Sequence, residues 1–170
     1  VSSLGSNPGD VVALCNQQFY VMESNDTNVV LMSMLNVDYQ TNRQSETAKD
    51  AIFRSGVGGY SGSDLENYIN TYSSYLISMG FDNTATAISA SQLRGYGCTL
   101  DADEYIFSCP DTLPSWLTER NYWISFVGQA SMRFALVSGK LYTLSDPTST
   151  SGVRPVVTIT KENFNIYING

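Results

Sequence analysis

The chain of 170 residues carries nine basic and sixteen acidic side chains, giving a formal charge of −7, and its apolar fraction is 42%. This balance predicts a single folded domain and excludes a disordered chain. The basic residues are scattered singly and the net charge repels phosphates, so nucleic acid is not an expected partner. No apolar run approaches the roughly twenty residues of a membrane-spanning helix, so we predict no membrane span in this segment.

The absence of histidine narrows the chemistry that the chain can support. It removes the commonest general base and the commonest metal ligand. The sequence also has no phosphate-binding loop, no nucleophile elbow and no metal-ligand spacing. We therefore predict that the protein is not an enzyme and that it uses no cofactor.

The first nine residues, 1–9, are small, polar and turn-prone, which predicts a leader or linker. The remaining residues, 10–170, are expected to form one domain. Neither a signal-peptide core nor an amphipathic transit pattern follows Val1, so we expect any targeting segment to lie outside this sequence.

Three β-rich runs open the domain. They span residues 11–15, 19–23 and 29–35, and turn-forming residues 24–28 precede the third run. This pattern predicts a hairpin or a three-stranded meander. Within the first run, Cys15 is expected to be a small buried residue.

The middle third contains the clearest helix. Residues 38–59 predict a loop with at most one short helical element, near 48–53. Ser63 and Glu66 then form a capping-box pattern, and the helix is expected to end at Gly80. Its apolar residues recur every three or four positions, which favours the core over a ligand site: Leu65, Tyr68, Ile69, Tyr72, Leu76 and Met79.

A second, shorter helix is expected from Ser89 to Leu93. Ser89 and Ser91 are suited to capping its first turn, and Leu93 is expected to point inward. Gly95 and Gly97 follow and predict its end. The middle third is therefore the helical part of an otherwise β-rich chain.

Cys98 and Cys109 lie eleven residues apart, a spacing that lets the loop between them close as a cross-linked hairpin. We expect them to form a disulfide, which stabilises a loop of this length by about 3 kcal/mol. The few lysines, the many Ser, Thr, Asn and Tyr residues and the lack of histidine favour an extracellular protein. The alternative is two reduced thiols in a cytosolic domain, and Cys15 is left without a partner.

Acidic residues gather within that loop, and a calcium site is one hypothesis because carboxylates are preferred ligands of Ca²⁺. They are Asp101, Asp103 and Glu104, with Asp111 beyond them. The spacing lacks the glycine and the final glutamate of an EF-hand loop, so a solvated acidic turn is the simpler interpretation. A hydrolase that uses these carboxylates as acid and base is a further alternative.

The last third combines aromatic anchors with alternating segments. Trp116 and Trp123 are expected in the core, because their rings are costly to leave in water. Residues 125–144 alternate in polarity and turn at 138–140, which predicts a hairpin. The tail 164–168 also alternates, and we expect a strand that pairs within the domain or adds to a neighbour's sheet edge.

A buried strand is predicted near the C-terminus from Val153, Val156, Thr158 and Ile159. Pro155 belongs near the start or edge of this strand because it has no N–H to donate. Arg154 has two interpretations: a ligand contact, or a guanidinium that binds neighbouring loop carbonyls and a carboxylate. The second interpretation, a scaffold role, is favoured.

Four segments of this last third resemble a known family: 112–117, 121–123, 138–142 and 152–159. They resemble the closing half of the C-type-lectin-like domains of bacterial surface and phage-related proteins. This grouping includes DUF6273-type domains and the variable proteins of diversity-generating retroelements. The resemblance implies an α+β, C-type-lectin-like fold with mixed β-sheets, one main helix and a short second helix.

The resemblance also implies where a ligand binds, on the hairpin strands and on the loop before the last strand. The matching positions are Ser125, Phe126, Gln129, Arg133, Tyr142, Ser145 and Asp146. The chain lacks the paired calcium motifs of carbohydrate-binding C-type lectins. It also lacks the paired cysteines of formylglycine-generating enzymes, so neither activity is expected.

From these residues and this resemblance we expect a non-catalytic extracellular module for adhesion or receptor recognition, on a cell or virion surface. It would present the hairpin and loop to a protein or glycan receptor. The alternative is a structural subunit of a pilus, fibre or surface layer that self-assembles through its C-terminal segment.

Overall fold

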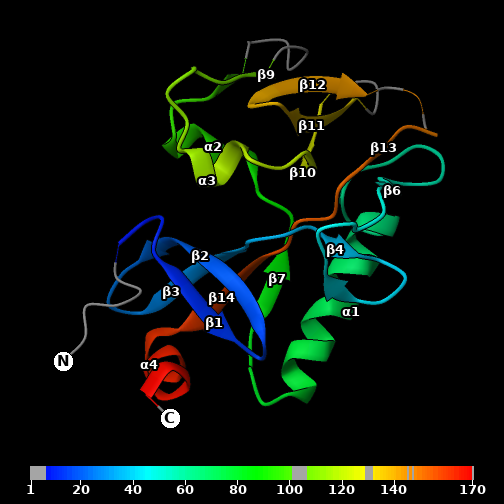
Figure 1. Cartoon of the computed structure of the whole chain (residues 1–170). Helices are drawn as coiled ribbons and strands as arrows, with labels where there is room; N and C mark the ends of the chain where they lie inside the picture. Colours follow the sequence, from blue (N-terminus) through cyan, green and yellow to red (C-terminus); the bar gives the residue numbers. More distant parts are fainter. Residues whose placement is uncertain (1–6, 101–106, 129–131, 145, 147, 170) are drawn as a thin grey trace.

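A computed structural model describes residues 7–100, 107–128, 132–144, 146 and 148–169. The fold is α+β, as predicted, with several antiparallel sheets and few helices. The largest sheet has five strands in the order β1-β2-β3-β14-β7, and every neighbouring pair is antiparallel (Figure 1). Its strands are β1 (Val11–Leu14), β2 (Gln17–Ser24), β3 (Asn28–Ser33), β7 (Thr84–Thr86) and β14 (Val156–Thr160).

The predicted N-terminal meander is confirmed in β1, β2 and β3, but Cys15 lies outside its strand. Cys15 and Asn16 form a two-residue turn with φ angles of 54° and 61°. Such a turn joins two strands tightly because its left-handed backbone matches their twist. Cys15 is therefore a partly exposed, unpaired turn residue, and not a buried strand residue. Partial burial raises the pKa of its thiol.

The region predicted as a loop with one short helical element contains three two-residue strands instead. They are β4 (Val37–Asp38), β5 (Arg43–Gln44) and β6 (Ala51–Ile52). The weak helical pattern near 48–53 was misleading because distant contacts fix Ala51 in an extended conformation. Ala51 pairs with Ser151 of β13 (Thr150–Ser151), and the Ala51 carbonyl accepts the indole N–H of Trp123 at 2.7 Å.

The two predicted helices are confirmed. In α1 (Asp64–Ser78) the Ser63 hydroxyl accepts the Glu66 N–H, whereas the Glu66 carboxylate accepts from Gly62 and not from Ser63. The short α2 (Ala90–Gly95) has the complete reciprocal capping box between Ser89 and Gln92. Most of the predicted apolar stripe of α1 is fully buried: Leu65, Ile69, Tyr72 and Leu76. Tyr68 is partly buried and Met79, beyond the last turn, is exposed.

Cys98 and Cys109 form the predicted disulfide. It closes a hairpin of β8 (Thr99–Leu100) and β9 (Phe107–Ser108). The acidic residues of the calcium hypothesis, Asp101, Asp103 and Glu104, lie outside the described residues. Within the described part of the chain, no three His, Cys, Asp or Glu side chains are grouped to hold a metal. No helix there has the length and apolarity needed to cross a membrane.

The predicted hairpin of the last third is confirmed as part of a three-stranded sheet. Its strands are β10 (Tyr122–Val127), β11 (Arg133–Val137) and β12 (Lys140–Leu144), preceded by the single turn of α3 (Ser115–Thr118). The turn between β11 and β12 is again two residues in the left-handed region, Ser138 and Gly139. Trp123 is a buried anchor as predicted, whereas Trp116 is only partly buried.

The tail expected to be a strand is a helix, α4 (Lys161–Asn169). The spacing of the apolar residues in this tail fits a strand and also fits a helix, and the packing of the tail against the rest of the domain selects the helix. Phe164 is 1% exposed, and the ring of Tyr167 lies 4.8 Å from that of Phe81. The Tyr167 hydroxyl also accepts the backbone N–H of Asp82. The tail thus covers its own sheet, so it offers no strand for assembly with a neighbour.

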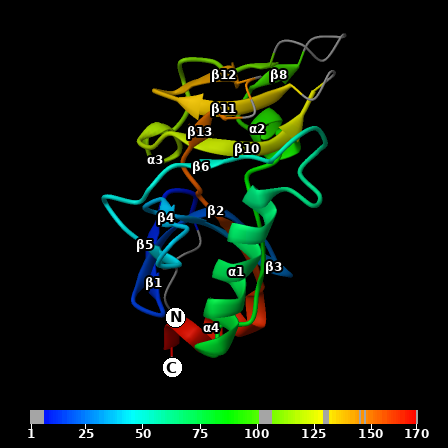
Figure 2. The same cartoon turned by 90° about the vertical axis from the view of Figure 1, so that its right-hand side faces the viewer.

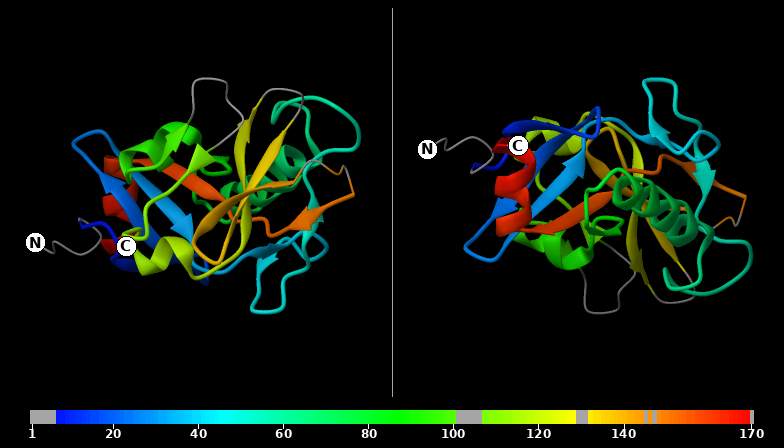
Figure 3. Two further views of the ribbon diagram at one scale, coloured as in Figure 1. Left: turned by 90° about the horizontal axis from the view of Figure 1, so that it is seen from above. Right: turned by 90° about the horizontal axis from the view of Figure 1, so that it is seen from below.

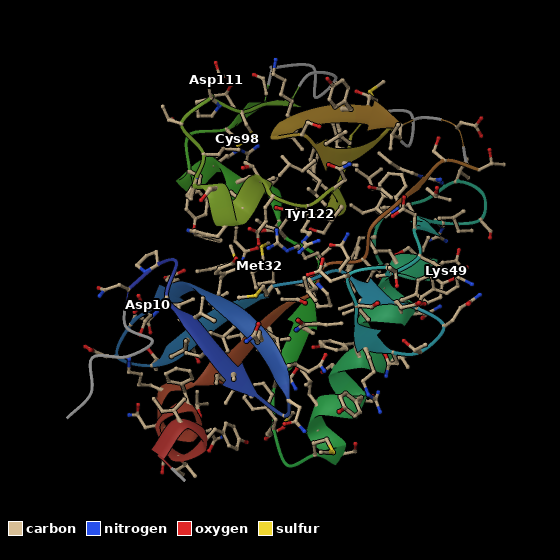
Figure 4. All side chains as sticks on the ribbon, viewed as in Figure 1. Asp10, Met32, Lys49, Cys98, Asp111 and Tyr122 are labelled. Atoms are coloured by element: carbon tan, nitrogen blue, oxygen red, sulfur yellow. A yellow bond between two sulfur atoms is a disulfide. The ribbon has the colours of Figure 1, made fainter. Side chains whose placement is uncertain are left out.

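The five-stranded sheet separates two hydrophobic clusters. Helices α1 and α4 pack on one face, over residues such as Phe19, Leu31 and Val157. The view from below shows the two helices against this sheet (Figure 3, right). On the other face, Met32 meets Tyr122 at the junction with the three-stranded sheet (Figure 4). The three-stranded sheet takes part in both clusters, because its alternate residues point in opposite directions.

Arg154 lies at this junction and is fully buried. Its Nε and one Nη donate to the carbonyls of Ser33, the last residue of β3, and of Met34, which follows it. The same guanidinium donates to the carbonyls of Trp116 and Leu117 in α3, at 2.9 and 3.4 Å. The Glu119 carboxylate lies 3.6 Å away and balances the charge. Arg154 is therefore a scaffold residue, as favoured from the sequence, that ties the large sheet to the upper part of the molecule.

Replacing Arg154 by lysine should lower the free energy of unfolding by at least about 2 kcal/mol, because an ammonium cannot reach carbonyls on both sides and leaves buried acceptors unpaired. Urea denaturation monitored by tryptophan fluorescence measures the loss. The control is Arg120→Lys. Arg120 pairs with the mostly exposed Glu46, so the change should cost less than about 1 kcal/mol. Equal losses in the two variants would refute the role given to Arg154.

Position 152 requires glycine because no larger residue fits there, and not because of the backbone conformation. A Cβ there would lie 2.1 Å from the Asn36 Nδ2 and 2.3 Å from the Asn121 carbonyl oxygen. The Gly152 carbonyl also accepts the Trp123 N–H, so the backbones are held together at this point. The close approach explains why the segment that leads to Arg154 begins with glycine.

The change Gly152→Ala should therefore destabilise the fold by about 1–3 kcal/mol through overpacking. Thermal unfolding followed by circular dichroism measures it. Gly95→Ala is the matched control, since no atom lies within 4 Å of a Cβ at Gly95. Because Gly95 is helical, alanine there should be neutral or stabilise by up to about 1 kcal/mol.

Candidate binding surface

One end of the molecule gathers segments that are distant in the sequence. Thr150 of β13 pairs with Ile52 of β6, so the chain leaving β6 lies beside the chain that enters β13. Figure 2 faces this end. We define the display surface as the loop 54–62, the exposed residues Asp146 and Thr148, and Tyr142 of β12. The loop contains four glycines: Gly56, Gly58, Gly59 and Gly62.

Arg54 holds the loop from within. Its Nη1 donates to the carbonyls of Gly59 and Ser61, at 3.2 and 2.8 Å. Gly58 has a φ of +135°, and a Cβ there would lie 2.7 Å from the Arg54 guanidinium. Only glycine fits both the backbone and the space at this position. The loop therefore wraps closely around one arginine side chain.

Arg133 holds the same loop from β11. Its guanidinium donates to the Arg54 carbonyl at 3.1 Å and to the Gly56 carbonyl. It lies 5.6 Å from the centroid of the Phe53 ring, and the residue is only 3% exposed. The sequence placed Arg133 on the contact surface, but its strand points it inward, where unpaired loop carbonyls need a donor. Arg133 positions the loop and does not present its charge to a ligand.

The loop is also tied to the start of α1. The Ser55 N–H and hydroxyl both donate to the same carboxylate oxygen of Asp64, at 2.8 and 3.3 Å. With the loop backbone hydrogen-bonded to Arg54, Arg133 and Asp64, the Val57 side chain at the tip is 80% exposed. An apolar side chain on a held backbone is thereby available for contact with a partner.

Of the predicted contact residues that the structure describes, Tyr142 and Asp146 are the two that are exposed. Tyr142 is 50% exposed and pairs with Ala135, so it shares a sheet face with Arg133, which lies two residues from Ala135. Asp146 accepts the N–H and hydroxyl of Thr148, both at 2.8 Å. These hydrogen bonds lower the pKa of the Asp146 carboxyl, so it stays ionised.

Ser125 and Phe126 are occupied elsewhere. The Ser125 N–H and hydroxyl both donate to the Ile88 carbonyl, which fastens β10 to the segment before α2. Phe126 is partly buried, and its ring lies 5.7 Å from that of Phe134. Gln129 and Ser145 lie outside the described residues. Of the predicted set, the structure therefore brings Arg133, Tyr142 and Asp146 to this end of the molecule, with Arg133 beneath the surface.

Sequence reasoning missed Val57 and the role of its loop. The available signal was the valine between glycines, with an arginine just before them. Glycines that surround one apolar residue indicate a loop whose side chain has no core to enter. The prediction for residues 38–59 was a loop, with no role for these glycines.

Comparisons of this chain with models of protein families, with curated proteins and with solved structures found no match. The display surface offers an apolar tip, a half-exposed phenol and an ionised carboxylate on a fixed backbone. These are groups for contact and hydrogen bonding with a partner.

The change Arg133→Met should lower the free energy of unfolding by about 1–3 kcal/mol and speed amide hydrogen exchange in residues 56–62, because two loop carbonyls lose their donor. Urea denaturation and exchange mass spectrometry measure the two effects. The control Arg94→Met removes an exposed arginine of α2 and should change stability by less than about 0.5 kcal/mol. Unchanged exchange in the loop would show that Arg133 does not position it.

Proposed function

We propose that this chain is a non-catalytic extracellular binding module that presents the display surface to a protein or glycan receptor. The observation that carries the proposal is the tip of the loop 54–62. Two arginines and Asp64 fix its backbone, and Val57 nevertheless points into water. A preorganised apolar tip reduces the entropy lost on binding, which is the usual benefit of a rigid recognition loop.

The disulfide supports an extracellular location, because such bonds persist in oxidising compartments. The proposal includes the C-type-lectin-like resemblance. In its favour, the segment 152–159 is scaffold, with Arg154 buried and Val156 to Thr160 forming a central strand. The hairpin implied to carry the ligand also lies, in the sequence, between α3 and β14.

The assembly alternative has lost the feature that motivated it. A tail that adds to a neighbour's sheet must be extended, and α4 is a helix packed on its own sheet. The display surface does not depend on this tail. Receptor recognition is therefore the function that these observations favour.

The double variant Val57→Ser/Tyr142→Ser should lose at least about tenfold in receptor affinity, because exposed aromatic and apolar anchors dominate interface energies. The wild-type chain is first screened on arrays of glycans and of folded extracellular proteins, and the affinity for each bound spot is then measured by biolayer interferometry. The change in the free energy of unfolding should stay below about 1 kcal/mol, because Val57 is 80% and Tyr142 is 50% exposed.

Ile77→Ser/Met79→Ser is the matched control. It removes two apolar side chains of similar exposure at the opposite end of α1, about 22 Å from its start. Retained binding in this control, with loss in the first variant, supports the display surface. Equal losses would place the receptor site elsewhere, and an array with no bound spot would refute the binding module.

A further inference from the structure

A cleft of about 360 Å³ lies beside the β1–β2 hairpin, away from the display surface. It is lined by four carboxamide side chains and two apolar ones: Asn16, Gln17, Gln18, Gln44, Ala13 and Leu35. Ala13 and Gln18 face each other across β1 and β2, which are in the foreground of Figure 1. The volume lies within the range of small-ligand sites.

Two of the lining residues, Gln17 and Gln44, are held by an amide network. The Gln17 Oε1 accepts the Gln44 N–H at 3.0 Å and the Tyr72 hydroxyl at 3.2 Å. The Gln44 Nε2 in turn donates to the Tyr72 hydroxyl and to the Gln18 carbonyl. Tyr72 is fully buried in α1, and burial raises the pKa of its phenol, which keeps the hydroxyl protonated as a donor. Gln17 and Gln44 are therefore fixed in position beside the cleft.

The rim carries amides with unused hydrogen-bonding capacity. Among the described residues, the side chains of Asn16 and Gln18 make no hydrogen bond, and both residues are exposed. Asn16 is held by the left-handed turn described above, so its position relative to the cleft is set by the hairpin. Each side chain offers two donor hydrogens and an acceptor oxygen on the same group.

The cleft has no charged lining residue. The nearest cation in sequence, Arg43, stacks on the Tyr75 ring at 3.4 Å and donates to the Asn42 carbonyl. A carboxylate or phosphate placed here would lack a counter-ion, which disfavours an anionic ligand. A carboxamide pairs well with a hydroxyl, since each is both donor and acceptor.

We infer that this cleft binds a neutral, hydroxyl-rich ligand, a saccharide unit, at a site separate from the display surface. A peptide backbone also suits carboxamides, but a peptide needs pockets for its alternate side chains. Ala13 and Leu35 are the only apolar lining residues, so the cleft favours a saccharide. The inference does not rest on the function proposed for the display surface.

Side-chain amide signals in ¹H–¹⁵N spectra of the full chain test this inference. The probes are neutral cello-, chito-, manno- and malto-hexaoses, with tetra-alanine as the peptide probe. We expect at least one saccharide to shift the Asn16 and Gln18 amide signals. Gln18→Leu, and independently Asn16→Gly, which keeps the left-handed backbone, should each weaken that binding about tenfold. Both side chains are exposed, so neither change should lower the melting temperature.

Asn165→Leu, at an exposed carboxamide of α4, should leave the saccharide-induced shifts of the Asn16 and Gln18 signals unchanged, as should Val57→Ser/Tyr142→Ser. Loss of these shifts in the latter variant would show that the two sites are one and would overturn the inference. So would shifts produced by tetra-alanine alone. If no saccharide shifted the Asn16 and Gln18 signals, the inference would be overturned as well.

Discussion

The burial of one cation, the guanidinium of Arg154, determines how the two parts of this fold meet. It donates to four backbone carbonyls, two at the end of β3 and two in α3. A carbonyl has a fixed place relative to its strand or helix, so the four contacts fix an orientation and not merely a proximity. Gly152 allows the chain to approach closely enough for this to happen, and Glu119 at the rim offsets the cost of removing the charge from water.

Arg133 repeats the same principle at the display surface. It too donates to backbone carbonyls, here those of Arg54 and Gly56 in the glycine-rich loop 54–62. Arginine suits both positions because its planar donors reach several acceptors from one buried side chain. Few ion pairs are involved: only Arg120 and Arg154 form salt bridges among the described residues. Four of the nine basic side chains, those of Arg43, Arg54, Arg133 and Arg154, donate to backbone carbonyls of their own chain.

Local patterns were predictable from the sequence, and those that depend on distant contacts were not. The capping residues Ser63 and Ser89 identified both helices because capping is decided within four residues. The predictions were wrong for the tail 164–168 and for the segment around Ala51. Distant contacts decide their conformation, since the tail packs against Phe81 and Ala51 binds Trp123. Arg133 illustrates the limit for a site: its place in an alternating strand was clear, but which face is covered depends on a loop seventy-seven residues earlier in the chain.

The hydrogen bonds that hold the loop 54–62 go to backbone atoms. The conformation of the loop therefore does not depend on which residue occupies its tip. Arg54 and Arg133 bind carbonyls, which every amino acid possesses, and Val57 lies outside the left-handed region of backbone conformation. Natural or laboratory variation at this position therefore alters what is displayed without altering how it is held. Gly58 allows no such freedom. Position 57 is thus open to substitution, while its immediate neighbour Gly58 is fixed.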